Sequence, residues 1–140
     1  MSGQATSKFT LALNKKIEDT NSLFAQLVRA ALSVATTATS EQREAMKFLN
    51  FVDGDGVDHR DISALSLIVM RGTSSELKKF GDGARERRLG YANVTQAMVH
   101  GNANASATGA KPPEPEYIAV IAFGGKPEIE AATGRLSLWR

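Results

Sequence analysis

Five side chains that could bind a metal ion or exchange protons lie close together in this chain; they are Asp53, Asp55, Asp58, His59 and Asp61. Carboxylate oxygens bind Ca²⁺ and Mg²⁺, and a histidine beside carboxylates can act as a general acid or base. The sequence Asp53-Gly-Asp-Gly56 is also typical of a tight turn, because Asp and Gly form turns and cap helices. The cluster therefore has three interpretations: a metal site, an acid–base site, or an exposed turn.

This segment resembles part of a calcium-binding loop of the EF-hand or dockerin type, but its register does not fit such a loop. With Gly56 at the sixth position, the first position is Phe51 and the twelfth is Ile62, and neither side chain offers an oxygen. With Asp53 at the first position, Val57 occupies the fifth. We therefore predict an exposed turn without a metal ion. A small metal-dependent enzyme that uses this cluster is one alternative.

Catalytic signatures are absent from the rest of the sequence. The chain has no cysteine, which excludes disulfides, thiolate zinc sites and cysteine nucleophiles. It also has no G-x-S-x-G motif, no Walker loop and no complete G-x-G-x-x-G motif. The two histidines, His59 and His100, do not have metal-ligand spacing. We predict that the protein is not an enzyme and uses no cofactor.

Basic residues gather between positions 71 and 98, where six bases face three acids, a net charge of +3. Such side chains contact phosphates, and a tyrosine can stack on a base. The candidate nucleic-acid contacts are Arg71, Lys78, Lys79, Arg85, Arg87, Arg88 and Tyr91. A solvated helix face explains the same charges, because the formal net charge of the whole chain is only +2.

Acidic residues gather earlier in the chain, between positions 41 and 61. Six acids face three bases there, a net charge of −3. Two patches of opposite sign suit head-to-tail association, in which the acidic patch of one subunit meets the basic patch of the next. Mutual neutralisation within one fold is the competing interpretation.

Hydrophobic spacing predicts the elements of the first half of the chain. Alternation predicts a strand at 9–13, and apolar residues at three- and four-residue spacing predict a helix from about residue 15 or 21 to residue 36. Thr39 and Gln42 have the pattern of a capping box, which predicts a second helix that reaches Val52.

The second half is less regular. The apolar run 62–70 fits a helix or a buried strand, and we favour the helix. A short helix is predicted at 77–80, after the capping sequence Thr73–Glu76, and another at 84–99. A strong β run at 117–123 is expected to return as a hairpin by Leu138.

All four prolines lie between Pro112 and Pro127, and the stretch 101–116 has no large apolar side chain. We therefore divide the chain into a mainly helical body with an N-terminal strand (1–100), an extended arm (101–116) and a C-terminal β segment (117–140). An arm of this kind suits a subunit that reaches a neighbour. The candidate interface residues are Tyr117, Ile118, Val120, Ile121, Phe123, Leu136, Leu138 and Trp139.

The sequence predicts an α+β fold: three to five helices with a small antiparallel sheet from the N-terminal strand and the C-terminal hairpin. The favoured function is a non-enzymatic, self-assembling structural subunit of a virus or phage particle, a homo-oligomer locked by its arm and terminal strands. The alternative is a small nucleic-acid-binding or regulatory accessory protein that uses the basic segment 71–88. No secretory signal or membrane-spanning stretch is visible, so we expect cytoplasmic synthesis, no membrane contact, and the virion as the final location.

Overall fold

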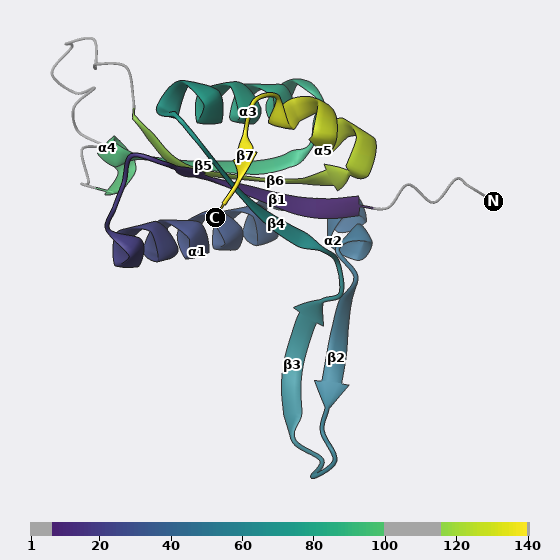
Figure 1. The fold of residues 1–140 in the computed structure, drawn as a ribbon. Helices are drawn as coiled ribbons and strands as arrows, with labels where there is room; N and C mark the ends of the chain where they lie inside the picture. Colours follow the sequence, from purple (N-terminus) through teal and green to yellow (C-terminus); the bar gives the residue numbers. More distant parts are fainter. Residues whose placement is uncertain (1–6, 100–115, 140) are drawn as a thin grey trace, which may run out of the picture.

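The computed structural model describes residues 7–99 and 116–139, so the predicted arm lies outside the described residues except for Glu116. The described chain forms a five-stranded mixed sheet with helices on both faces, and a separate two-stranded hairpin projects from this body (Figure 1). In chain order the elements are β1 (Ser7–Asn14), α1 (Thr20–Thr37), α2 (Ser40–Ala45), β2 (Phe48–Val52), β3 (Asp58–Ser63), β4 (Leu67–Gly72), α3 (Ser74–Glu86), β5 (Gly90–Thr95), α4 (Gln96–Val99), β6 (Tyr117–Gly125), α5 (Lys126–Thr133) and β7 (Ser137–Leu138).

The sheet has the strand order β5-β6-β1-β4-β7, which places the N-terminal strand at its centre. β1 pairs parallel with β4 and antiparallel with β6. β5 and β7 complete the sheet by antiparallel pairing with β6 and β4. β1 is buried from Phe9 to Asn14 and β6 from Ile118 to Phe123, because helices cover both faces of these strands. Their nearly continuous apolar sequences are what such a position requires.

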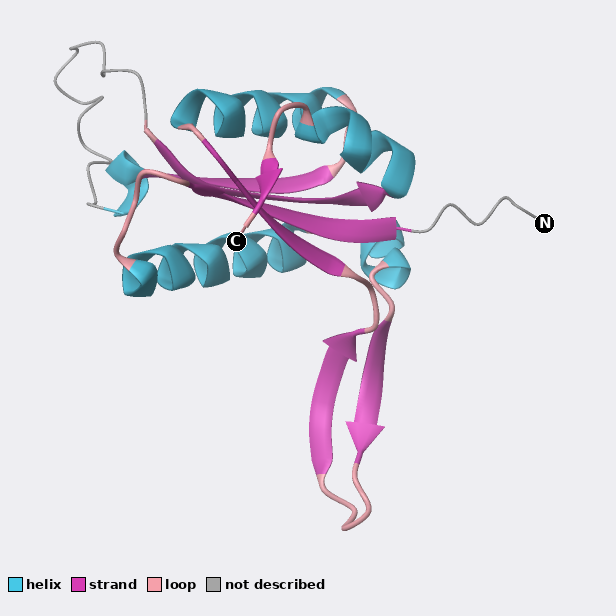
Figure 2. Ribbon diagram, in the orientation of Figure 1, coloured by secondary structure: helices cyan, strands magenta, loops and turns pink. Residues whose placement is uncertain are grey.

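Helix α1 covers one face of the sheet, and α3 and α5 cover the other (Figure 2). Side chains alternate along β1, so Phe9, Leu11 and Leu13 join the apolar cluster beneath α1, whereas Ala12 joins the cluster beneath α3 and α5. α1 buries one stripe at three- and four-residue spacing, consisting of Leu23, Gln26, Ala30 and Val34. The core therefore has two layers, one on each side of the sheet.

Both predicted capping boxes are present. The Thr39 hydroxyl accepts a hydrogen bond from the Gln42 N–H at 3.0 Å, and the Gln42 amide oxygen accepts one from the Thr39 N–H at 2.9 Å. Thr73 and Glu76 make the same pair of bonds at the start of α3. These bonds satisfy N–H groups that a helix start leaves without a partner.

The hairpin and β4 correct two predictions. The helix expected to reach Val52 ends at Ala45, and the helix favoured at 62–70 is wrong, because β3 and β4 occupy that region. Lys47, just after α2, has a φ of 55°, a left-handed conformation that a right-handed helix cannot continue. β4 is a strand because it pairs in parallel with β1, a long-range contact that no local pattern contains.

The remaining boundaries also differ from prediction. α3 is longer than the predicted short helix and runs through Gly81, where a Cβ would lie 2.7 Å from Asn93 Oδ1; glycine thus lets α3 pack closely on β5. The helix predicted at 84–99 is wrong, since most of that stretch is β5 followed by the short α4. The strand at 117–123 is confirmed as β6, but α5 replaces most of the expected return strand.

The chain is an α+β protein, as predicted, but its sheet is mixed and five-stranded. The observed sheet includes β4 and β5, which come from a region that was predicted to be helical. The predicted sheet was smaller, antiparallel and formed only by the terminal segments. Within 7–99 and 116–139, no helix is both long enough and apolar enough to cross a membrane.

Candidate docking surface

The hairpin formed by β2 and β3 exposes apolar side chains on both of its faces. No residue of either strand is buried. Strand alternation puts Leu49 and its cross-strand neighbour Ile62 on one face and Phe48 on the other. The hairpin residues that are apolar and 40–64% exposed are Phe48, Leu49, Phe51, Val52, Val57 and Ile62. A two-stranded hairpin that packs against nothing is marginally stable in water.

Hydrogen bonds fix the base of the hairpin to the body. The Ala64 N–H donates to the Lys47 carbonyl at 2.9 Å, and the Ser63 hydroxyl donates to the Met46 carbonyl. Met46 is itself buried in the core beneath α1. The direction in which the hairpin leaves the body is therefore set by contacts with the core.

A second exposed apolar surface lies on α1. Phe24, Val28 and Leu32 follow one another at four-residue spacing and are 57%, 56% and 63% exposed. Residues four apart share one face of a helix, so these three side chains form a continuous stripe. The stripe lies on a different side of α1 from the residues that the helix buries against the sheet.

The α1 stripe and the hairpin base meet in an apolar groove of about 530 Å³. Val28 and Leu32 line it from α1, Phe48 and Ile62 from the hairpin, and Leu67 from β4. Ser63 is the one polar residue in its lining, and its hydroxyl is already bonded to the Met46 carbonyl. The groove can therefore bury apolar side chains but offers little to a polar ligand.

The acidic cluster singled out in the sequence lies at the tip of the hairpin, with Asp53 and Asp55 in the loop and Asp58, His59 and Asp61 on β3. Asp53 accepts hydrogen bonds from the N–H groups of Asp55 at 2.9 Å and Val57 at 3.0 Å, and its other oxygen lies 2.7 Å from His59 Nε2. The hydrogen bond with His59, followed by that from Val57, lowers the pKa of Asp53 below its usual range. Across the described residues, no group of three Asp, Glu, His or Cys side chains converges to hold a metal ion. The geometry is that of a carboxylate-stabilised turn.

The basic residues lie on two elements and on the turn that follows α3. Arg71 lies on β4, whereas Lys78, Lys79 and Arg85 lie on α3, and Arg87 and Arg88 follow that helix. Asp82 pairs with Lys78 at 2.8 Å and with Arg85 at 3.5 Å. Tyr91 is half-buried and packs against the apolar cluster beneath α3, so its ring is not a free stacking surface. Nucleic-acid binding by this segment stays a prediction.

Most of the predicted interface residues are part of the chain's own core. Ile118, Val120, Ile121, Phe123 and Leu136 are buried, because β6 lies between β5 and β1 in the sheet and Leu136 packs beneath α3 and α5. In the single chain these residues are therefore not exposed to a neighbouring subunit.

The other three predicted interface residues are accessible to different degrees. Tyr117 is half-buried, whereas Leu138 and Trp139 are 51% and 41% exposed. The Trp139 N–H donates to the Val69 carbonyl at 3.0 Å, which holds the end of the chain along the sheet edge. Leu138 and Trp139 are the most exposed of the eight candidates, and the interface itself stays a prediction.

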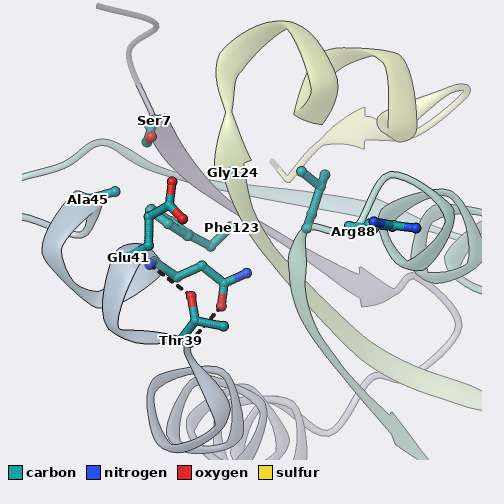
Figure 3. Close-up of a pocket in the computed structure, with 9 residues that line it drawn as sticks. Ser7, Thr39, Glu41, Ala45, Arg88, Phe123 and Gly124 are labelled. Atoms are coloured by element: carbon teal, nitrogen blue, oxygen red, sulfur yellow. Dashed lines mark hydrogen bonds between the residues drawn. The ribbon is translucent and has the colours of Figure 1, made fainter.

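A further pocket of about 390 Å³ lies where α2 approaches the ends of β1 and β6 (Figure 3). Thr39 and Gln42 line it, but both are engaged in the capping box. Glu41 and Arg88 lie on opposite sides of the pocket in Figure 3. Its polar groups therefore do not converge on one point, as a binding or catalytic site requires.

The comparison with family models decides how this chain is classified. A model described as a protein of unknown function, DUF2000, matches residues 8–140. The chain belongs to the DUF2000 family. Among curated proteins, none matches its sequence. A solved structure of a protein of unknown function from Agrobacterium tumefaciens has 13% sequence identity and a TM-score of 0.70, and the match covers 96% of this DUF2000 chain and 98% of that one. At this identity the likeness shows the fold alone.

Sequence reasoning missed the hairpin, although a local signal for it exists. Asp-Gly next to an apolar run is a short-range indication of a hairpin, and here an apolar run ends at Val52 just before Asp53-Gly54, although only Val57 is apolar directly after Gly56. The capping box upstream favoured a long helix instead. No sequence signal shows that the apolar residues of this hairpin stay exposed, because exposure depends on where the hairpin leaves the body.

Proposed function

We propose that this protein is a non-enzymatic subunit that self-associates through its apolar hairpin and the exposed stripe of α1. The hairpin carries the proposal, since its apolar residues are exposed and it has no core of its own. Burial of apolar surface is the main favourable term in protein association. Contiguous exposed apolar patches mark interaction sites on soluble proteins.

The proposal moves the expected contact to a different part of the chain. The sequence favoured an arm and terminal strands, whereas the hairpin and α1 offer more exposed apolar surface than Leu138 and Trp139 do. A virion as the assembled form stays a prediction, because neither the fold nor the family description names an assembly. The self-associating subunit is the part of that prediction that the hairpin supports.

Light scattering coupled to size-exclusion chromatography tests the proposal. The wild-type chain is expected at a multiple of its 15.0 kDa mass. A variant with Leu49→Ser and Ile62→Ser, which removes one apolar cross-strand pair, is expected to elute as a monomer. Its matched control carries Asn50→Ala and Asp61→Ala, the next cross-strand pair along the same strands, and is expected to keep the wild-type mass.

Two results contradict the proposal. One is a wild-type protein that remains at 15.0 kDa throughout a dilution series extending to high concentration. The other is an equal loss of mass in the apolar variant and in its control, which indicates a general disturbance of the hairpin. Circular dichroism of each variant shows whether the body keeps its helices and sheet.

A further inference from the structure

We infer that the partner is a second copy of this chain, and that the hairpin of each copy lies along the α1 groove of the other. This inference rests on the proposed self-association and specifies its geometry. The groove is the apolar space of about 530 Å³ between α1 and the hairpin base. The occupant is the exposed apolar part of the partner's hairpin.

The shape of the chain suits this arrangement. Figure 1 shows the hairpin projecting from the body on the side of the sheet that α1 covers, so the body and the hairpin form the two arms of an L. Val28 on α1 and Ile62 on the hairpin both line the inner corner. Two such shapes related by a two-fold axis interlock, with each hairpin against the other's α1. This symmetry closes the assembly at two copies, as in most soluble homo-oligomers.

The exposed apolar surface is large enough for such a dimer. Ten large apolar side chains belong to the hairpin, the α1 stripe and the start of β4, and they are 40–64% exposed; they are Phe24, Val28, Leu32, Phe48, Leu49, Phe51, Val52, Val57, Ile62 and Leu67. An aromatic side chain has about 150–250 Å² to bury and an aliphatic one less, so these ten, about half exposed, present on the order of 800 Å² in total over both faces of the hairpin and α1. A standard specific interface buries about 800 Å² per partner.

The charges of the two surfaces are complementary. The hairpin, residues 48–63, carries four acids and one base, a net charge of −3. Arg29 is the one charged residue of α1, and it is exposed next to Val28 of the stripe. Contact between the hairpin of one copy and α1 of the other therefore brings opposite charges together at the rim of an apolar contact, which favours the correct register. Contact between two hairpins instead opposes two surfaces of net −3.

The chain's own remaining segments are poor occupants of the groove. The stretch 101–116 contains no large apolar side chain, and residues 1–6 contain one, Met1. Neither can supply the apolar area that the groove and the hairpin leave exposed. A second copy supplies a hairpin for the groove and a groove for the hairpin at the same time.

Cysteine cross-linking tests this geometry directly, because the chain has no cysteine of its own. A tagged copy with Val28→Cys is mixed with an untagged copy with Phe51→Cys and treated with a short bismaleimide linker. Both positions are exposed, so each variant is expected to fold. The expected product is a cross-linked pair that carries one tag, formed several-fold more than the product of either variant alone. A matched pair, Val28→Cys with Lys126→Cys on the far side of the sheet, is expected to give little product.

The outcomes separate the inference from the proposed function. If light scattering shows a dimer but the linker joins only Phe51 to Phe51, or Val28 to Val28, the reciprocal arrangement is wrong and self-association stands. If the mixed variants give no cross-link above the control pair while the dimer persists, the inference is also wrong. If the wild-type chain is a monomer at every concentration, the inference and the proposed function fail together.

Discussion

β6 and β2, the first strand of the hairpin, are both apolar segments, but β6 is buried and β2 is exposed. β6 lies between β5 and β1 with helices on both faces, and its residues from Ile118 to Phe123 are buried. In the hairpin, β2 and β3 pair only with each other, and none of their residues is buried. The difference is in the neighbouring elements, since β2 (FLNFV) is nearly as apolar as β6, whereas its partner β3 (DHRDIS) is mostly polar.

This contrast shows which apolar residues hold the single chain together. An apolar side chain stabilises a fold by the surface that it removes from water. The residues of β6 do this within one chain, whereas those of the hairpin stay largely in water until a partner covers them. The body should therefore determine the stability of the monomer, and the hairpin and α1 stripe should determine association.

The largest expected effect is a loss of unfolding free energy in the body. Phe80 on α3 is fully buried in the cluster beneath α3 and α5, so Phe80→Ala should cost about 3–5 kcal/mol of unfolding free energy through the cavity that it leaves. Urea denaturation at low protein concentration measures the cost. Phe51→Ala on the hairpin is the control and should change the same quantity by less than about 0.5 kcal/mol, as exposed substitutions do. Equal effects at both positions would falsify the division between body and hairpin.

The second expected effect is a weaker association of the chains without a loss of stability in the body. Leu32→Asp places a charge in the centre of the proposed contact, and we expect the dissociation constant to rise by roughly 100-fold, a cost of ~2–3 kcal/mol. Analytical ultracentrifugation measures it. Ser33→Asp adds the same charge one residue along α1, outside the stripe, and is expected to leave association near the wild-type value. A similar loss in both variants points to charge alone and not to the stripe.

The same contrast explains what the sequence could predict. β1, α1 and β6 were expected at nearly their observed positions, because each has a periodic apolar pattern that is decided locally. The capping boxes at Thr39 and Thr73 could also be predicted from the sequence, since their donors and acceptors lie three residues apart. These elements depend on residues that are close in the chain.

The elements that sequence reasoning placed wrongly depend on distant residues. β4 has an apolar run that fits a helix or a strand, and its parallel pairing with β1 decides the matter. Gly81 breaks the predicted helix pattern, but its reason is a distant residue, because Asn93 of β5 lies close to where a Cβ at this position would be. Most of the predicted interface residues are buried in the single chain. The predicted interface used β6, whose apolar residues are needed by the core, whereas the exposed apolar surface belongs to a segment predicted to be a helix. Composition shows that a strand is apolar, but only the fold shows what covers it.

A smaller effect compares the two capping boxes. Thr73 caps α3, which buries Leu77 and Phe80, whereas Thr39 caps α2, which buries no residue. We expect Thr73→Ala to cost about 1 kcal/mol of global stability and Thr39→Ala to cost less, because α2 can fray without opening the core. Thermal unfolding of both variants measures the difference, and Thr73→Ser should restore most of the loss. If Thr39→Ala costs as much, α2 belongs to the cooperative body.

The α3 cap also has a pH dependence whose sign follows from Glu76. The hydrogen bond from the Thr73 N–H lowers the pKa of Glu76 below its usual range. A carboxylate with a lowered folded pKa stabilises the fold above its unfolded pKa, and this contribution is lost as the pH falls through the folded pKa. The Glu76→Gln variant, which keeps a side-chain acceptor, should lose part of that acid sensitivity.

The smallest expected effect is a pH-dependent loosening of the turn at the tip of the hairpin. The structure of the body should not change with it. Asp53 holds the turn through the Val57 N–H and His59, and its pKa is lowered chiefly by the bond to His59. The ionised carboxylate thus stabilises the turn above the usual carboxyl pKa, and the turn should loosen as the pH falls through the lowered value. The Val57 amide resonance should report this change in NMR spectra. Asp53→Asn should reproduce the acid-side shift at neutral pH, whereas Asp55→Asn should not. An equal response of amides in β6 would show that hairpin and body are coupled, and that the two regions are not the independent units that their burial indicates.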